Sequence, residues 1–206
     1  PGVFALSMEV YFRALYFLVP GYLVLYSFTS LYTPRRATRI RNEISSIFKW
    51  ARTHVTSTLY ICWAAQAGLY YHYGVPKYPL DQKMFGVFPQ QSLQPQLPIF
   101  RGFDDVFMMP HSRHTEIRRE DILACKDLQL IAESDECGVS MVMARGGREF
   151  FIMGHLEYSP DTLDLEYKRD INVRDDVKLP VNYYRNDDPS QPPMVSWRAH
   201  ANLLYN

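Results

Sequence analysis

The sequence has no excess of charge of either sign, because its 22 Lys and Arg residues are balanced by 22 Asp and Glu residues. Proteins that bind nucleic acid or acidic surfaces through charge usually carry a basic excess or a long basic run. The charge balance therefore speaks against that class, and we expect no nucleic-acid partner.

Cysteine is scarce, and the spacing of the cysteines suggests no disulfide pairs. The chain has three cysteines, an odd number, and they form no CxxC motif: Cys62, Cys125 and Cys137. Small secreted domains held by disulfides show an even number at closer spacing. The pattern therefore argues against a disulfide framework and favours a reducing, cytoplasmic setting.

Metal-ligand motifs are also lacking. His111 and His114, with Glu116, superficially suggest a site, but the helical HExxH spacing and a matching cysteine pair are absent from the sequence. Catalytic and structural zinc sites depend on such spacings. We therefore expect no metal.

A long run without charge occurs at residues 14–34, "ALYFLVPGYLVLYSFTSLYTP". Its length would permit a membrane helix. The Pro20-Gly21 break and the many hydroxyl side chains instead favour a pair of buried strands, or a damaged segment. We expect no membrane anchor.

Strands and helices alternate from residue 44 onward, which favours an α/β layered domain with a mostly parallel sheet and flanking helices. Helices are predicted at 43–55, 63–74 and 159–171 and from residue 196, with Gly74 as a left-handed cap. Strands are predicted at 56–62, 105–109, 123–134, 138–144 and 149–158. Residues 75–88 are expected to be a proline-broken loop leading into a short strand, and 110–116 a polar loop.

Cys62 lies in "LYICWAAQAG", where an apolar strand gives way to a helix. A cysteine in apolar surroundings is usually a small core residue. At a strand-to-helix turn it can instead be an activated thiolate, because the helix N-terminus stabilises negative charge. The Trp63 N–H is then a candidate oxyanion donor. Both interpretations stay open on this stretch alone.

A general base for such a thiolate is suggested by "FFIMGHLEYSP". His155 follows an apolar strand, and functional residues gather at the carboxyl ends of strands in such folds. Glu157 lies two residues on, so in extended backbone both side chains would share a face. A carboxylate there could orient the imidazole to accept the cysteine proton.

Several long blocks together resemble the homoserine O-acyltransferases of methionine biosynthesis. They are "THVTSTLYICWAAQAGLYYHYGVPKYPLDQKMFGVF", "RGFDDVFMMPHSRHTEIRRED", "GHLEY" and "SWRAHANLLYN". The resemblance runs from about Ser45 to Asn206. It implies the class I glutamine amidotransferase-like (flavodoxin-like) fold, with residues 44–206 as one acyltransferase body.

The resemblance also implies roles for particular residues. Cys62 would be the nucleophile that forms an acyl-thioester, His155 the proton acceptor and Glu157 the orienting acid. Three residues would contact substrate: Lys83, Ser112 and Arg169. From the residues alone, Lys83 could equally be a solvent-exposed charge in a loop. Arg169 could equally form an ion pair with Glu166 or Asp170 on a helix surface.

The implied activity is amino-acid biosynthesis by acyl transfer from acetyl-CoA, or alternatively succinyl-CoA, to the hydroxyl of L-homoserine. The resemblance implies no permanently bound cofactor, with the acyl-CoA as a co-substrate, and it suggests a homodimer. "GVPKYPL" and "PHSRHTE" look closer to the acetyl-using members. The same three catalytic residues could also hydrolyse glutamine amide, as in amidotransferase domains.

Residues 1–43 depart from the family pattern. Relatives carry a Gly-Ala-Pro-type turn in this region, which is missing here, and Leu31 falls near the position that selects the acyl group. We expect residues 1–43 to be a divergent or frame-displaced segment, and both chain ends to be cuts. A catalytically impaired fragment is therefore a further alternative. Leu156 replaces a frequent proline between His155 and Glu157, with little effect expected.

Overall fold

The computed structural model describes residues 34–205 and, before them, the backbone of five short strands; side chains are described for residues 42–205. The short strands are β1 (Phe4–Ala5), β2 (Phe12–Arg13), β3 (Tyr16–Val19), β4 (Tyr22–Leu25) and β5 (Phe28–Thr29). Leu31 lies outside the described residues.

The chain forms two compact units. The first comprises Pro1–Lys77, Glu120–Gln129 and Met141–Met153, and the second comprises Tyr78–Arg119, Leu130–Ser140 and Gly154–Asn206.

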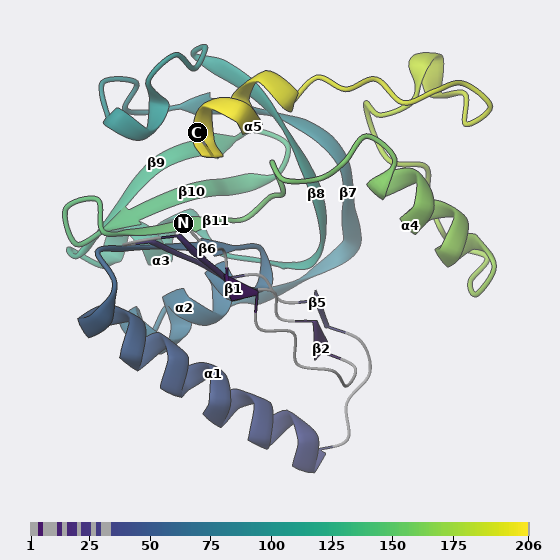
Figure 1. The fold of residues 1–206 in the computed structure, drawn as a ribbon. Helices are drawn as coiled ribbons and strands as arrows, with labels where there is room; N and C mark the ends of the chain where they lie inside the picture. The colour runs from purple at the N-terminus through teal and green to yellow at the C-terminus, as the bar shows by residue number, and fades with distance from the viewer. Residues whose placement is uncertain are drawn as a thin grey trace. The chain divides into compact units, whose positions relative to one another are not determined.

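The first unit is a sheet with helices (Figure 1). Its elements after β5 are α1 (Pro34–His54), β6 (Ser57–Ile61), α2 (Trp63–Tyr73), most of α3 (Arg119–Ala124), the end of β10 (Gly138–Ala144), and β11 (Glu149–Ile152). Its strands lie in the order β1-β3-β4-β6-β11-β10. The central strand β6 pairs in parallel with both β4 and β11.

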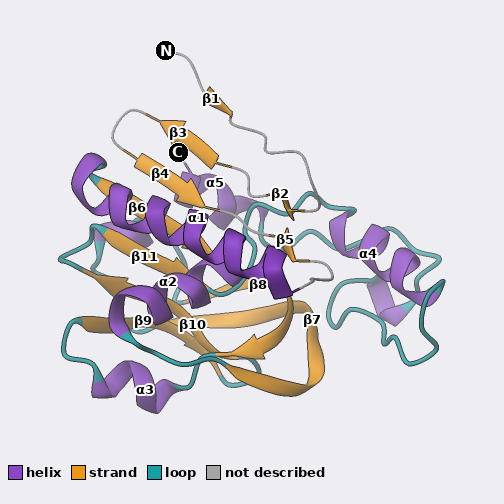
Figure 2. Cartoon of the chain, turned by 90° about the horizontal axis from the view of Figure 1, so that it is seen from below, coloured by secondary structure: helices purple, strands orange, loops and turns teal. Residues whose placement is uncertain are grey.

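Aromatic packing joins the helices of the first unit to its central strands, and Figure 2 shows α1 and α2 on one face of them. The Phe48 ring of α1 meets the Tyr60 ring of β6 edge-on at 5.3 Å, and Tyr60 stacks on Phe151 of β11 at 4.7 Å. Gly68 allows α2 to approach, because a Cβ there would lie 3.0 Å from the Phe151 ring. These contacts pack α1 and α2 against β6 and β11.

The second unit is built on a long antiparallel hairpin. Its elements are β7 (Tyr78–Ser92), η1 (Pro98–Phe100), β8 (Val106–Glu116), most of β9 (Leu128–Ser134), the start of β10, α4 (Thr162–Ile171), η2 (Arg185–Asp187) and α5 (Arg198–Tyr205). Strand β7 pairs antiparallel with β8 along most of its length and with β9 at its end.

The hairpin corrects two predictions. Residues 75–88 and 110–116 were expected to be mainly loops, yet they contribute most of β7 and the second half of β8. Pro79 lies directly before a shift in the pairing register, between Pro79 and Met84, and prolines within sheets are typical of such irregular pairing. The polar residues at 110–116 resemble a loop in sequence, but Ser112 donates to Glu166, and Arg113 donates to the Thr115 and Cys137 carbonyls.

Other predictions hold with shifted boundaries. The helix at 63–74 is confirmed, and Gly74 is its left-handed cap at φ 69°. Strands β3 and β4 pair antiparallel, in line with the strand pair expected for the uncharged segment; the expected burial concerns side chains outside the described ones. The sheet is mixed rather than mostly parallel, since the β3–β4, β10–β11, β7–β8 and β7–β9 pairs are antiparallel. The start of the strand expected at 123 belongs to α3 instead.

None of the helices in the described part of the chain combines the length and the apolar character needed to cross a bilayer.

Candidate active site

Cys62 lies at the turn between β6 and α2, as its sequence context predicts. Its backbone adopts φ 52° and ψ −113°, a conformation that L-residues rarely occupy. The Cys62 N–H donates to the Ile152 carbonyl at 2.7 Å, and the Cys62 carbonyl accepts from the Gln66 N–H at 3.2 Å. The turn is thus held from the strand side and from the helix side.

The turn leaves Cys62 partly exposed above a closed core. Ile61 and Ala65, on either side of it in sequence, are buried, whereas the cysteine is not. Trp63 is the first residue of α2, so its backbone N–H belongs to the first turn of that helix. A helix N-terminus stabilises a thiolate or an oxyanion. The oxyanion role of Trp63 stays a prediction.

His155 and Glu157 are in direct contact in the second unit. The His155 Nδ1–H donates to Glu157 Oε1 at 2.6 Å, which leaves Nε2 as the ring nitrogen able to accept a proton. His155 is 6% exposed. The contact arises from a turn and not from extended backbone as expected, because the Tyr158 N–H donates back to the His155 carbonyl at 3.3 Å.

The turn is fixed at its first residue by strand β8. The His155 N–H donates to the Pro110 carbonyl at 2.8 Å. Gly154 makes this approach possible, because a Cβ on it would lie 2.7 Å from the same carbonyl oxygen. The close approach of the two backbones therefore depends on a residue without a side chain.

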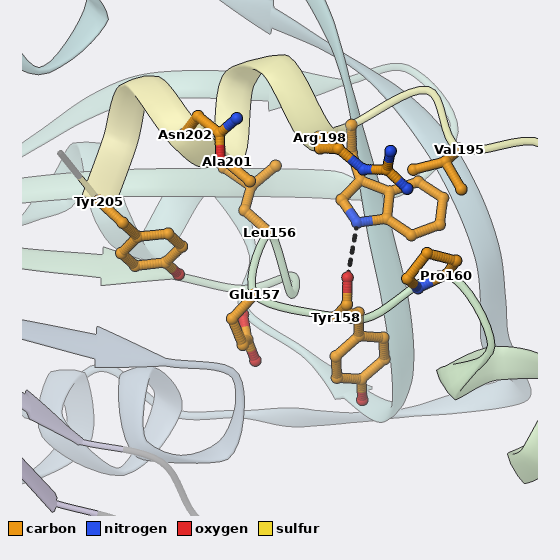
Figure 3. A pocket seen from close by; sticks show the side chains of 10 residues that line it. Leu156, Glu157, Tyr158, Pro160, Val195, Arg198, Ala201, Asn202 and Tyr205 are labelled. Atoms are coloured by element: carbon orange, nitrogen blue, oxygen red, sulfur yellow. Dashed lines mark hydrogen bonds between the residues drawn. The ribbon is translucent and has the colours of Figure 1, made fainter.

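A pocket of about 370 Å³ lies beside this turn (Figure 3). It is lined by residues of the turn, Leu156 to Tyr158, and by residues of α5, among them Ala201 and Asn202. The Trp197 indole Nε1–H donates to the Tyr158 carbonyl at 3.0 Å and ties the two walls together. Leu156, expected to matter little, is 1% exposed and forms part of the wall.

The three predicted substrate residues converge on one carboxylate. Glu166 Oε1, on α4, accepts from Lys83 Nζ at 2.7 Å and from Ser112 Oγ at 2.7 Å, and lies 3.5 Å from Arg169 Nη2. Lys83 and Ser112 come from β7 and β8, so the hairpin and α4 build this cluster together. We call Lys83, Ser112, Glu166, Arg169 and Asp170 the α4 cluster.

Asp170 supplies a second negative charge in the α4 cluster. It lies 3.1 Å from Lys83 Nζ and 2.7 Å from Arg169 Nη2. Burial by itself would raise the pKa of Asp170, but hydrogen bonds from Arg169 and Lys83 outweigh it and hold the pKa below its ordinary value. Arg169 therefore makes the surface ion pairs that its sequence context allowed, while Lys83 is largely buried and no solvated loop charge.

Sequence reasoning missed Glu166 as part of the candidate site. Its signal was present, because Glu166, Arg169 and Asp170 are three and four residues apart and so share one face of a helix. Their meeting with Lys83 and Ser112, 83 and 54 residues away from Glu166, could not be read from that spacing.

The histidines considered for a metal site are separated by strand geometry. His111 is fully buried, whereas His114 is exposed. Burial, and then the Arg113 charge, hold the pKa of His111 well below its ordinary value. The Arg113 Nε–H donates to His111 Nδ1 at 3.4 Å, and Cys137 Sγ lies 3.6 Å from its Nε2. Within the described residues, no three His, Cys, Asp or Glu side chains are grouped to hold a metal ion.

The family described as homoserine O-succinyltransferase matches residues 37–206. The chain belongs to this family. It is 68% identical over 165 residues to a homoserine O-acetyltransferase from Phocaeicola vulgatus, and 66% identical over 165 residues to one from Bacteroides fragilis. Each alignment covers 80% of this chain and 54% of the relative, so the chain spans about half the length of the curated relatives it matches.

A solved structure supports the fold. The crystal structure of a glutamine amidotransferase from Thermotoga maritima has a TM-score of 0.63 at 14% identity, covering 89% of this chain and 74% of that chain. At this identity the likeness shows fold and not function. The class I glutamine amidotransferase-like fold is confirmed for this member of the homoserine O-succinyltransferase family.

Proposed function

We propose that this chain carries the acyl-transfer chemistry of a homoserine O-acetyltransferase, with acetyl-CoA as donor and L-homoserine as acceptor. The observation that carries the proposal is Cys62 in its strained strand-to-helix turn, partly exposed at the N-terminus of α2. That position suits a nucleophile and does not suit a core cysteine. The names of relatives at 66% and 68% identity favour acetyl over succinyl.

In the first half-reaction, the proton of the Cys62 thiol passes to His155 Nε2, and the sulfur attacks the thioester carbonyl carbon of acetyl-CoA. The tetrahedral intermediate carries its negative charge on the former carbonyl oxygen, which accepts hydrogen bonds from N–H groups at the start of α2, including that of Trp63. Collapse breaks the bond to the coenzyme A sulfur, which takes the proton from His155. Cys62 is left as an acetyl-thioester.

In the second half-reaction, His155 Nε2 accepts the hydroxyl proton of homoserine while that oxygen attacks the thioester carbon. Collapse breaks the carbon–sulfur bond, and Cys62 recovers the proton as O-acetylhomoserine leaves. Glu157 keeps the Nδ1–H in place throughout and stabilises the imidazolium that forms twice in the cycle.

The α4 cluster is the proposed binding region for the amino-acid end of homoserine. A guanidinium fork and an ammonium, supplied by Arg169 and Lys83, suit a carboxylate, and Glu166 suits an ammonium group. Before substrate binds, these side chains neutralise one another. The mixed charges of the cluster therefore match a zwitterion better than a simple anion.

A homodimer and a cytoplasmic setting remain predictions that fit this function. Equilibrium sedimentation of the purified chain would test the dimer, and a single species at the monomer mass of 24.1 kDa would exclude it.

Intact-protein mass spectrometry tests the proposed activity. The purified chain is incubated with acetyl-CoA or with succinyl-CoA, and L-homoserine is then added. We expect one acetyl adduct, its loss in Cys62→Ser, and its discharge by homoserine. Cys125→Ser is the matched control, because Cys125 is also partly exposed but lies outside the β6–α2 turn, and it should keep the adduct.

Each other result has a distinct meaning. A succinyl adduct in place of the acetyl adduct would assign the alternative donor. Release of ammonia from glutamine with no adduct from either donor would instead support amide hydrolysis. A folded chain with neither activity would contradict the proposal and indicate a catalytically impaired fragment.

The discharge step also tests the α4 cluster. Glu166→Gln should form the adduct at the normal rate, while the homoserine concentration for half-maximal discharge rises about tenfold or more through loss of the ammonium contact. Unchanged discharge would remove Glu166 from the acceptor site.

A further inference from the structure

The imidazole of His155 is held on its face as well as at its edge. The Tyr158 ring stacks on it with ring centroids 4.1 Å apart and an interplanar angle of 16°. Glu157 binds the Nδ1 edge of the same ring. The turn that follows His155 therefore supplies two side chains to the imidazole from adjacent positions.

Tyr158 is itself anchored at its backbone. Its N–H donates to the His155 carbonyl at 3.3 Å, and its carbonyl accepts from the Trp197 indole at 3.0 Å. Trp197 is 1% exposed, so this anchor is part of the core of the second unit. The dashed line at the Tyr158 carbonyl in Figure 3 marks this hydrogen bond.

The two contacts restrain different motions of the His155 side chain. One hydrogen bond at Nδ1 fixes the tautomer but still permits the ring to rock about the line joining Nδ1 to the carboxylate oxygen. A planar partner on the ring face opposes that rocking, because tilting the ring would break the stack. Together they fix the direction in which Nε2 points.

We propose that Tyr158 is a positioning residue that holds the plane of the His155 imidazole, so that Nε2 keeps the direction needed for proton transfer. This inference rests on the proposed function of His155 as the base. The aromatic ring is the required feature and the phenol hydroxyl is not. The ring face also favours the imidazolium form that arises during each half-reaction.

Three variants in the full chain test the role of the Tyr158 ring. Tyr158→Phe keeps the stack, whereas Tyr158→Leu and Tyr158→Met replace it with non-planar side chains; flexible Met is the second choice if Leu disturbs folding. The rate of adduct formation at saturating acetyl-CoA should stay within about threefold in Tyr158→Phe and fall about tenfold to a hundredfold in the other two. The acetyl-CoA concentration for half-maximal rate should not change.

A matched control removes a different ring contact to a histidine in the same unit. Phe103 meets His200 with centroids 5.0 Å apart at 61°. Phe103→Leu should acylate at the unchanged rate. An equal loss of rate in Phe103→Leu would show general loosening of the unit and overturn the proposal.

Nitrogen-15 NMR of the histidine rings gives a readout that does not depend on activity. The Nδ1–H signal of His155 should be sharp and shifted downfield in the unchanged chain and in Tyr158→Phe, and broadened in the Leu and Met variants. Sharp signals in every variant would overturn the positioning role even if no adduct forms. If the signal broadens in the Leu and Met variants but the unchanged chain forms no adduct, the positioning role would be supported and the proposed function contradicted.

Discussion

His72 shows how burial alters the chemistry of one residue. It packs against Phe48 at 5.6 Å, and its Nε2 lies 3.0 Å from the Tyr60 hydroxyl. Burial, and next the charge of Arg52, lower the pKa of His72 to about 4 from its ordinary 6.5. Burial likewise raises the pKa of Tyr60, so its hydroxyl stays protonated and donates to the neutral imidazole.

This shift predicts loss of stability in mild acid. The unfolded chain takes up a proton on His72 near pH 6.5, and the folded chain resists until about pH 4. The stability contributed by neutral His72 is therefore present above pH 6.5 and is lost as the pH falls from 6.5 to about 4. In urea unfolding, His72→Gln should lose less stability over this interval than the unchanged chain.

The control for that experiment is His54→Gln, which replaces an exposed histidine at the end of α1. Its stability should fall with pH as steeply as that of the unchanged chain. Equal slopes for His72→Gln and the unchanged chain would contradict the assigned cause.

At the scale of elements, Glu149 joins two helices to β11. Its carboxylate accepts from Arg52 Nε at 2.7 Å, Arg52 Nη2 at 3.0 Å and the Tyr73 hydroxyl at 2.6 Å. Burial by itself would raise the pKa of Glu149, but these bonds outweigh it and hold the pKa below its ordinary value. Glu149 begins the strand whose last residue, Ile152, accepts the Cys62 N–H.

Glu149→Gln should lower the free energy of unfolding by about 2–4 kcal/mol, because it leaves a guanidinium without its bidentate partner. The partial exposure of Arg52 keeps this cost below that of a fully buried charge. Glu133→Gln breaks a more exposed pair with Arg119 and should cost at most about 0.5 kcal/mol in the same urea titration. An equal loss of unfolding free energy in the two variants would contradict the role of Glu149 in joining α1 and α2 to β11.

At the scale of the whole chain, two short strands before α1 extend the sheet of the first unit. Strand β4 pairs in parallel with β6, and β3 pairs with β4, so these two strands cover one edge of β6. Parallel strands are normally covered, and an exposed edge invites association with other chains. The prediction of a separate, divergent segment at 1–43 stays a prediction; the family match itself begins at residue 37.

A chain that begins at residue 34 should therefore aggregate more readily, with greater light scattering as concentration rises and a lower urea midpoint. Both follow from the exposed edge of β6. A shortened chain that scatters less than the full chain would show instead that the apolar segment itself promotes aggregation.

Local features were predictable because they depend on neighbouring residues. The turn at Cys62 follows from an apolar strand directly before a helix, and Gly74 marks the end of that helix. The contact of His155 with Glu157 was also foreseen, but through the wrong backbone, because a turn and an extended strand can both bring positions two apart together. The first part of β8 was predicted, but its second half was taken for a loop because it carries polar residues such as His111 and Arg113, which contact each other inside the core.

The sequence by itself determined the family, the strand-to-helix turn and the residues that could take part in catalysis. Each of these depends on residues that are close together in the sequence. Only the tertiary structure decided that Lys83, Ser112 and Arg169 meet at Glu166, and that Tyr158 stacks on His155. The physical reason is that strand pairing and helix packing bring distant segments together, and that ring orientation is set by the whole shell around a side chain. Neither leaves a periodic trace in the chain.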